Sequence, residues 1–289
     1  MEKKRTSRKS NNPIVALIYD FDGTLAPGNM QEYSFIKAVG REIEEFWGHT
    51  HQMARTQDAD GVLIYMLFML EEAKRMGIPL TRNSLRKFGE DITFFKGVES
   101  WFKRIDDIGA QEGVIVEHYI NSSGLLEILE GTKIAKEFKA MFASSYYYNK
   151  KGEAIWPAAA VNYTNKTQFL FKINKGILNI HDSERINASV PEEEKRVYFS
   201  NMIYFGDGET DVPCMKLTRQ LGGTSIAVYN PKQEKKKQIA ELLLKQNRVN
   251  YICPADYSKG SLVEEIVTNI FRKIKAEEQL LRLKKRQSK

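Results

Sequence analysis

Two carboxylates one residue apart, Asp20 and Asp22, follow directly on the apolar run Ile14–Tyr19. An apolar run of this kind, broken soon afterwards by Gly23, is typical of a strand buried in a parallel sheet. Side chains two residues apart on a strand point the same way, so both carboxylates would converge where open α/β sheets bind ligands. Such a pair repels unless a cation or a shared proton relieves it. The simpler alternative is an Asp-rich turn, because Asp-Gly is a common turn dipeptide.

A second acidic cluster has the same setting. Asp207 and Asp211 belong to the stretch Gly-Asp-Gly-Glu-Thr-Asp, which follows the apolar run 202–205. A hard divalent cation such as Mg²⁺ takes oxygen ligands, and carboxylates at two strand ends could supply them. A turn that only reverses the chain is the alternative, but two such clusters at strand ends favour a site.

These stretches resemble the haloacid dehalogenase-like (HAD) superfamily, in particular its phosphoserine-phosphatase-like members with a helical cap. Asp20, Asp22 and Thr24 match the first motif, Asp-x-Asp-x-Thr, and 206–211 match the fourth, Gly-Asp-Gly-x-x-Asp. The resemblance implies that Asp20 is the nucleophile, which forms an aspartyl-phosphate, and that Asp22 is the general acid and base. It also implies phosphate-ester chemistry, because dehalogenase-like members lack the second carboxylate.

The same resemblance implies a Mg²⁺ cofactor. Its protein ligands would be the Asp20 carboxylate, the backbone carbonyl of Asp22 and the Asp207 carboxylate. Asp211 would bind through a metal-bound water or orient the catalytic lysine. Other residues of the first motif are expected at the phosphate, namely Gly23 and Thr24.

A phosphate-binding hydroxyl is expected after the strand predicted over Gly113–Asn121. The superfamily's second motif is an apolar strand that ends in Ser or Thr. This motif selects Ser122, with Ser123 as the alternative and Gly124 beside them. A helix that begins here would also direct backbone N–H groups at the phosphate. Serine is equally common as an ordinary helix N-cap, so the assignment depends on the first motif.

The superfamily also needs a lysine near a helix start, whose ammonium neutralises the nucleophile and the transferred phosphoryl group. Lys166 follows Thr164-Asn165, which are good N-cap residues, and precedes an apolar helix face. Lys175 lies further along the same predicted helix and would project away from its start. We therefore expect Lys166 in this role, with Lys175 as the alternative.

The long stretch after the first strand is predicted to be helical. Apolar residues recur at helical spacing over 35–47, a second helix is expected over Val62–Met76, and others begin near Thr81 and Val98. A helical insert over 28–111 resembles the cap of many superfamily phosphatases, which excludes water and selects the substrate. Four arginines in it are candidates for contact with an anionic substrate: Arg41, Arg55, Arg75 and Arg82.

Strand-like and helix-like segments alternate in the rest of the chain, which predicts a parallel sheet with right-handed crossovers. We expect an α/β fold, with a doubly wound, Rossmann-like sheet formed by 13–27 and 112–275 and the α-helical cap inserted. The segments expected are a helix over Lys133–Lys139, a strand over Met141–Ser144, a hairpin around Gly152, a strand over Thr224–Tyr229, a helix over Gln233–Gln246, a strand over Val249–Cys253 and a last helix from Ser261.

The formal charge of +7 is concentrated at the ends of the chain. Residues 1–10 have a net charge of +4 and residues 271–289 of +6, which leaves −3 for the rest. We expect a disordered basic tail over 1–12 and a basic C-terminal tail over 276–289. A mildly acidic body does not favour specific binding of nucleic acid.

Two further features bear on the setting of the protein. The apolar run Val62–Leu70 is too short to span a membrane. Cys214 and Cys253 cannot form a disulfide framework in a chain of 289 residues, which favours a reducing, cytoplasmic compartment.

The expected function is Mg²⁺-dependent hydrolysis of a phosphomonoester through an aspartyl-phosphate on Asp20. The substrate class is a small phosphorylated metabolite, such as phosphoserine or a nucleotide. Two alternatives stay open. One is a phosphotransferase or mutase that uses the same intermediate, and the other is a protein that binds a phosphorylated ligand without turnover. The sequence predicts neither the individual substrate nor the oligomeric state.

Overall fold

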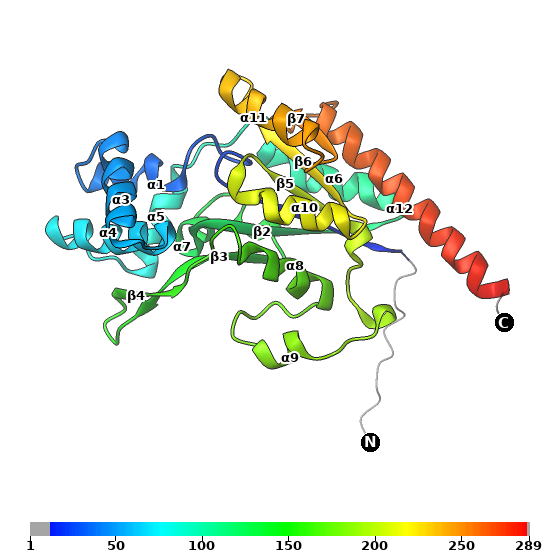
Figure 1. The fold of residues 1–289 in the computed structure, drawn as a ribbon, viewed down its shortest axis with the longest axis horizontal. Coiled ribbons are helices and arrows are strands. Elements are labelled where there is room, and N and C mark those ends of the chain that lie inside the picture. The colour runs from blue at the N-terminus through cyan, green and yellow to red at the C-terminus, as the bar shows by residue number, and fades with distance from the viewer. Residues whose placement is uncertain (1–11, 288–289) are drawn as a thin grey trace.

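The structure, a computed structural model, describes residues 12–287 and is built on one seven-stranded sheet (Figure 1). The strands are ordered β4-β3-β2-β1-β5-β6-β7, and all neighbours are parallel except β3 and β4. The strand order reverses at β1, where doubly wound sheets bind ligands. The predicted doubly wound α/β fold is therefore confirmed. The strands are β1 (Ile14–Tyr19), β2 (Ile115–Leu125), β3 (Ala140–Tyr148), β4 (Ala154–Ala159), β5 (Met202–Gly206), β6 (Thr224–Tyr229) and β7 (Tyr251–Pro254).

The central strand β1 is buried on both faces. Its side chains Val15, Leu17 and Tyr19 pack in one core with α6 and α12. Ala16 and Ile18 pack in a second core with α8, α10 and α11 on the opposite face. This alternation explains the unbroken apolar run that precedes Asp20. The helices after β1 that lie nearest the sheet are α6 (Val98–Glu112), α7 (Leu126–Glu130), α8 (Lys166–Lys175), α10 (Val212–Gln220), α11 (Glu234–Lys245) and α12 (Leu262–Gln287). The short helix α9 (Ser183–Asn187) packs on α8 instead.

A cluster of helices stands at one end of the molecule, after β1 in the chain (Figure 1). Its members are α1 (Met30–Tyr33), α2 (Phe35–Ala38), α3 (Ile43–Gln57), α4 (Gly61–Arg75) and α5 (Arg82–Glu90). We refer to these five helices as the helical cap. The next helix, α6, packs instead against β2 and α12. The last helix expected within the 28–111 insert therefore covers the sheet.

The predicted hairpin around Gly152 is confirmed, because β3 and β4 pair antiparallel. It lies against the helical cap. The Tyr146 hydroxyl donates to the carbonyl of Met66 at 2.7 Å, and the backbone N–H of Ala154 donates to the carbonyl of Leu80 at 2.7 Å. The hairpin thus joins the cap to the edge of the sheet.

Two predicted segments differ in the structure. The helix expected over Lys133–Lys139 is reduced to a 3₁₀ turn over Ala135–Glu137, because the backbone N–H of Lys139 already donates to the carbonyl of His118 as the chain enters β3. The strand β2 extends beyond Asn121 to Leu125, because Leu125 still pairs with β3. The strand–helix–strand order predicted after residue 224 is confirmed as β6, α11 and β7.

The C-terminal region is helical as far as the structure describes it. α12 runs to Gln287, so residues 276–287 of the tail expected over 276–289 continue the helix that precedes them. Their Ala, Glu, Gln, Leu, Lys and Arg side chains are strong helix formers. The tail expected over 1–12 lies outside the described residues except for Asn12. Among the helices of residues 12–287, none is long and apolar enough to cross a membrane.

Candidate active site

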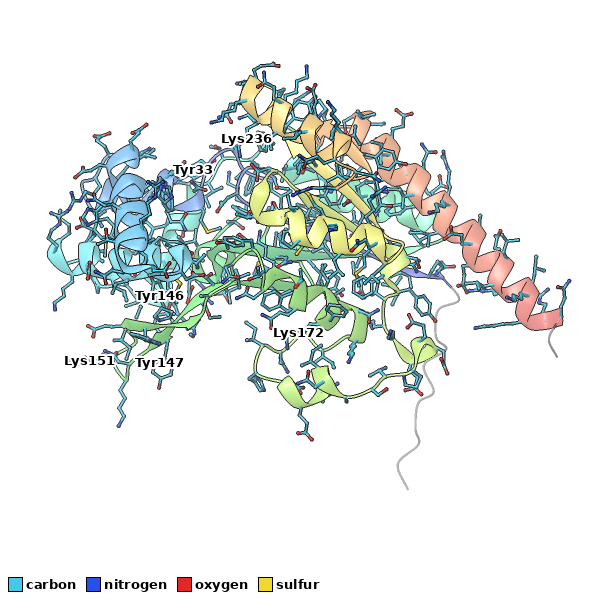
Figure 2. All side chains as sticks on the ribbon, in the orientation of Figure 1. Tyr33, Tyr146, Tyr147, Lys151, Lys172 and Lys236 are labelled. Carbon is cyan, nitrogen blue, oxygen red and sulfur yellow. The ribbon has the colours of Figure 1, made fainter. Side chains whose placement is uncertain are left out.

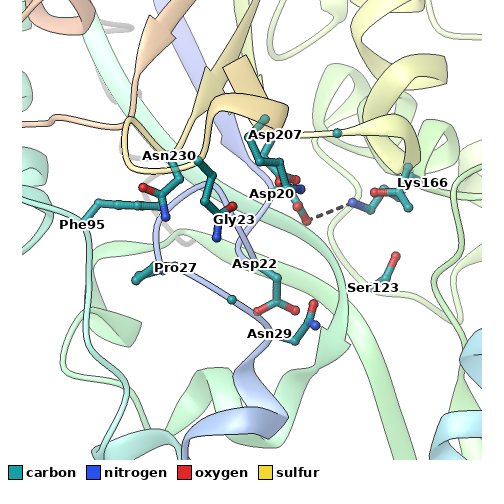
Figure 3. A pocket seen from close by; sticks show the side chains of 15 residues that line it. Asp20, Asp22, Gly23, Pro27, Asn29, Phe95, Ser123, Lys166, Asp207 and Asn230 are labelled. Atoms are coloured by element: carbon teal, nitrogen blue, oxygen red, sulfur yellow. Dashed lines mark hydrogen bonds and ion pairs between the residues drawn. The ribbon is translucent and has the colours of Figure 1, made fainter. Parts of the chain in front are cut away.

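Lys166 lies at the side of the cavity, with its ammonium directed at Asp20 (Figure 3). Its Nζ lies 2.9 Å from Asp20 Oδ1 and 2.8 Å from Asp211 Oδ1, and its side chain is only 1% exposed. An ammonium so far from water is costly unless it is paired and hydrogen-bonded. Burial lowers the pKa of Lys166, but the two carboxylates outweigh burial and hold that pKa well above its ordinary value. The lysine therefore stays charged.

Two asparagines hold the start of α8, of which Lys166 is the first residue. Asn121 Nδ2, in β2, donates to the carbonyl of Lys166 at 3.1 Å. Asn162 Oδ1 accepts the backbone N–H of Asn165 at 3.0 Å, and its Nδ2 donates to Asp60 Oδ2 at 2.8 Å. We expected Thr164 and Asn165 to cap the helix, but the side chain of the N-cap residue Asn165 makes no capping hydrogen bond. Asn162 instead fixes the loop and links it to the residue that caps α4.

Asp211 is fully buried just after β5. Its Oδ1 accepts the Tyr204 hydroxyl at 2.8 Å in addition to the Lys166 ammonium. Its Oδ2 is buried without a hydrogen-bond partner among residues 12–287. Gly206 makes room for this side chain, because a Cβ there would lie 2.5 Å from Asp211 Cγ. Tyr204 was not predicted, and its only signal was a hydroxyl in an otherwise apolar strand.

The two carboxylates of the first motif line one cavity of about 410 Å³ (Figure 3). The backbone N–H of Asp20 donates to the carbonyl of Phe205 at 2.9 Å, which joins the ends of β1 and β5. Asp22 Oδ1 accepts the backbone N–H of Met30 at 2.9 Å. Burial and the neighbouring Asp20 raise the pKa of Asp22 well above its ordinary value. The neutral acid is thus the favoured form of Asp22.

Three carboxylates could hold a cation. Asp20, Asp207 and Asp211 each present an oxygen within 4.8 Å of the others. Burial raises the pKa of Asp20 to about 7, and the Asp211 carboxylate acts in the same direction, although Lys166 opposes both. The excess of negative charge and the unpartnered Asp211 Oδ2 fit a hard divalent cation such as Mg²⁺. The Asp22 side chain is not in this group, so its expected part through the backbone carbonyl stays a prediction.

Asp207 lies directly over the loop that follows β1. A Cβ on Gly23 would lie 2.2 Å from Asp207 Oδ2, and Gly23 has a φ of +74°. Only glycine takes this conformation without strain and also leaves the space for the carboxylate. Gly23 therefore allows the segments that follow β1 and β5 to lie close together.

The structure separates the two candidate serines. Ser123 lines the cavity, whereas Ser122 is fully buried and its Oγ accepts the backbone N–H of Gly124 at 3.0 Å. Successive residues of a strand point to opposite sides, and both serines lie within β2. The alternative, Ser123, is therefore the residue placed to meet a ligand. Thr24 is buried and does not line the cavity, and its carbonyl accepts the Tyr257 hydroxyl at 2.9 Å.

The rest of the cavity wall comes mainly from loops. Gly208 and Thr210 belong to the fourth motif, whereas the other residues of this wall carry no sequence motif that marks them. The further lining residues are Pro27, Gly28, Asn29, Phe95, Gly208, Thr210, Asn230, Gln233 and Lys236.

The arginines considered for substrate binding do not line this cavity. Arg41 and Arg75 both bind Glu72, with Arg41 Nε 2.8 Å and Arg75 Nη2 2.7 Å from Glu72 Oε2. Arg82 lies over the ring of Tyr148. Arg55 is exposed on α3. These arginines serve the cap or face solvent.

Lys175, the alternative to Lys166, is not in the cavity wall. Its Nζ donates to the carbonyls of Ile186 at 2.6 Å and Ala188 at 2.8 Å. It thus holds the segment that follows α8 against that helix. Of the two lysines, only Lys166 contacts the carboxylates.

Comparison with known proteins identifies the fold. No family model matches the chain. An uncharacterized protein of Borreliella burgdorferi is 28% identical over 275 residues, which cover 86% of this chain and 93% of that protein. The apo form of a phosphoserine phosphatase is similar with a TM-score of 0.53 at 16% identity, over 88% of this chain and 97% of that chain. A phospho-aspartyl intermediate analogue of phosphoserine phosphatase is similar with a TM-score of 0.51 at 15% identity, over 89% of this chain and 99% of that chain.

This chain shares the fold of these phosphoserine phosphatases. At such low identities the likeness concerns the fold alone. In this chain Asp20 directly follows β1, Ser123 lies within β2, and Asp207 and Asp211 lie in the segment after β5. Carboxylate oxygens of Asp20, Asp207 and Asp211 lie within 4.8 Å of one another, and Ser123 lines the same cavity as Asp20 and Asp207.

Proposed function

We propose that this HAD-fold protein is a Mg²⁺-dependent phosphomonoester hydrolase that works through an aspartyl-phosphate on Asp20. The observation that carries the proposal is the buried contact of Lys166 with both Asp20 and Asp211, in a cavity that also contains Asp22. A nucleophile, a neutralising cation and a carboxyl group with a raised pKa are thereby present at one place.

In the first step, an Asp20 carboxylate oxygen forms a bond to phosphorus as the bond from phosphorus to the leaving oxygen breaks. The neutral Asp22 carboxyl gives its proton to that oxygen, so the alcohol leaves uncharged. The Lys166 ammonium offsets the negative charge of Asp20 and of the phosphoryl oxygens as they approach. The Ser123 hydroxyl, in the cavity wall, is placed to donate to a phosphoryl oxygen.

In the second step, the Asp22 carboxylate accepts a proton from water as the water oxygen attacks phosphorus. The bond from phosphorus to Asp20 breaks, which returns the Asp20 carboxylate and releases inorganic phosphate. Asp22 ends the cycle protonated, as it began. Asp20, Asp207 and Asp211 would hold Mg²⁺, which when bound supplies positive charge to the phosphoryl group.

The substrate we propose is a small phosphorylated metabolite. The cavity volume of about 410 Å³ lies within the usual range for small-molecule sites. The similar solved structures are described as phosphoserine phosphatases, which supports a small phosphomonoester as the substrate class. Both Cys214 and Cys253 are buried and unbridged, which supports a reducing compartment such as the cytoplasm.

Phosphate release tests the proposal. The purified protein is assayed with an aryl phosphate and a panel of phosphorylated metabolites, with and without Mg²⁺, beside the variant Asp20→Asn. We expect Mg²⁺-dependent release that the variant lacks, while circular dichroism shows an intact fold. Transfer of the phosphoryl group to an added alcohol in place of water would indicate a phosphotransferase, and silence across the panel with Mg²⁺ present would contradict the proposal.

A further inference from the structure

A second lysine contacts the proposed metal site. Lys236 Nζ lies 2.6 Å from Asp207 Oδ2, and both residues line the cavity. Asp207 is also one of the three carboxylates that could hold the cation. The pair therefore places an ammonium at an oxygen next to the position that Mg²⁺ would occupy.

The two lysines of the cavity differ in how firmly they are held. Lys166 is 1% exposed and has two carboxylate partners, whereas the Lys236 side chain is 39% exposed and has one. Exposed ion pairs of this second kind are weak, because water screens them and the long side chain loses freedom. Lys236 is thus the more easily displaced of the two cations.

The position of Lys236 in its helix is unfavourable for a cation. It lies in the first turn of α11, which begins at Glu234 (Figure 2). The amino end of a helix carries partial positive charge and disfavours a cation there. Lys235 and Lys237 share this turn and add like charge. The contact with Asp207 offsets this local cost only while that carboxylate remains available.

We infer that Lys236 is a displaceable counter-ion of Asp207. A metal ion that binds at Asp207 releases the Lys236 ammonium into the cavity, where the ammonium binds the anionic ligand. This inference rests on the proposed function. A divalent cation held by Asp207 repels the ammonium and binds the carboxylate more strongly than one exposed lysine does. The long lysine stem lets the released ammonium move to the phosphate, whose negative charge then attracts it. Metal binding and anion binding are thereby coupled through one side chain.

The test measures binding, not turnover, by isothermal titration calorimetry on the full chain. Mg²⁺ is titrated into wild type, Lys236→Met and Lys235→Met, and inorganic phosphate is then titrated at saturating Mg²⁺. Lys235 is the matched control, because it is exposed in the same turn and its loss changes the net charge equally. Thermal melts with and without Mg²⁺ check that each variant folds.

We expect Lys236→Met to bind Mg²⁺ about tenfold more tightly than wild type, since a competing cation at contact distance is removed. With Mg²⁺ bound, the same variant should bind phosphate roughly fivefold more weakly, as expected for one lost exposed charge contact. Lys235→Met should match wild type in both titrations. Mg²⁺ affinity that is unchanged or reduced in Lys236→Met, or unchanged phosphate affinity, would overturn the inference. Failure of wild type to bind Mg²⁺ at all would instead overturn the proposed metal site.

Discussion

The ammonium of Lys166 lies 2.9 Å from Asp20 Oδ1, although 146 residues separate the two in the chain. The parallel sheet produces this contact, because Asp20 directly follows β1 and α8 begins with Lys166 beside β2. The amide of Asn121 fixes the helix start from the neighbouring strand. The pairing of the Lys166 ammonium with the Asp20 carboxylate therefore depends on the arrangement of β1, β2 and α8 in the sheet.

Replacement of this lysine should remove most of the activity. We expect Lys166→Met to lower kcat by about 100-fold to 1000-fold, a loss typical when one group that stabilises transition-state charge is removed. The measurement is steady-state phosphate release with Mg²⁺. Lys175→Met is the matched control on the same helix, and it should keep near wild-type kcat because its ammonium binds backbone carbonyls away from the cavity. Equal losses in the two variants would contradict the assignment.

The two serines of β2 should differ in kinetics. Ser123→Ala removes a hydroxyl from the cavity wall, and we expect kcat/KM to fall by roughly tenfold or more through the loss of one hydrogen bond to the phosphoryl group. Ser122→Ala removes only a local contact with the backbone N–H of Gly124, so it should cost about 1 kcal/mol of stability and little activity. A larger kinetic loss in Ser122→Ala than in Ser123→Ala would reverse the assignment.

Gly23 should be required for metal binding as well as for the turn. In Gly23→Ala the new Cβ would lie 2.2 Å from Asp207 Oδ2, so the carboxylate must move. We expect loss of the rise in Tm that Mg²⁺ gives to wild type, together with about 1 kcal/mol of destabilisation from the positive φ.

Gly152→Ala is the control for this variant, because Gly152 has a φ of +78° with nothing within 4 Å of an added Cβ. It should show the same strain and keep the Mg²⁺ effect. A Mg²⁺ effect that survives in Gly23→Ala would separate Asp207 from the metal site.

The ion pair between Arg41 and Glu72 in the cap should make the stability of the protein depend on pH. Hydrogen bonds from Arg41 lower the pKa of Glu72 to about 2, below the ordinary value of 4.5. Because the folded state favours the charged form, this stabilisation is complete above about pH 4.5 and is lost as the pH falls toward 2. Glu72→Gln should therefore lower the free energy of unfolding by roughly 1–2 kcal/mol at neutral pH, and the difference from wild type should shrink in acid.

Urea unfolding of both proteins at several pH values measures this difference. Glu45→Gln serves as the control, because it removes an exposed partner of the same arginine and should have a small effect. A difference between wild type and Glu72→Gln that grows in acid would contradict the ion-pair account.

The sequence was sufficient for those features that one segment determines alone. The apolar run before Asp20 predicted a strand buried on both faces, and the two acidic clusters predicted where strand ends meet. The second motif favoured Ser122, whereas Ser123 is the serine that lines the cavity. Pairing with β3 prolongs β2 past Asn121, and a local pattern does not show where such pairing ends.

Other parts of the site depend on contacts between distant segments. Asn162 organises the start of α8 through hydrogen bonds that no local pattern distinguishes from those of an ordinary polar loop. Lys236 lies among three consecutive lysines, and only the packing of α11 determines which of them reaches Asp207. Tyr204 is one hydroxyl in a buried strand, and its role becomes visible only beside Asp211.

Asp20 is the residue that we propose to carry the phosphoryl group. An aryl phosphate needs little acid catalysis to leave, whereas hydrolysis of the intermediate needs the Asp22 carboxylate, so Asp22→Asn should accumulate the aspartyl-phosphate. Acid quenching followed by peptide mass spectrometry measures this directly. We expect the added mass of one phosphoryl group on the peptide that contains Asp20, and none in the double variant with Asp20→Asn. Phosphate release by a Mg²⁺-loaded protein without any phosphoryl group on Asp20, or with the group on another residue, would contradict the account.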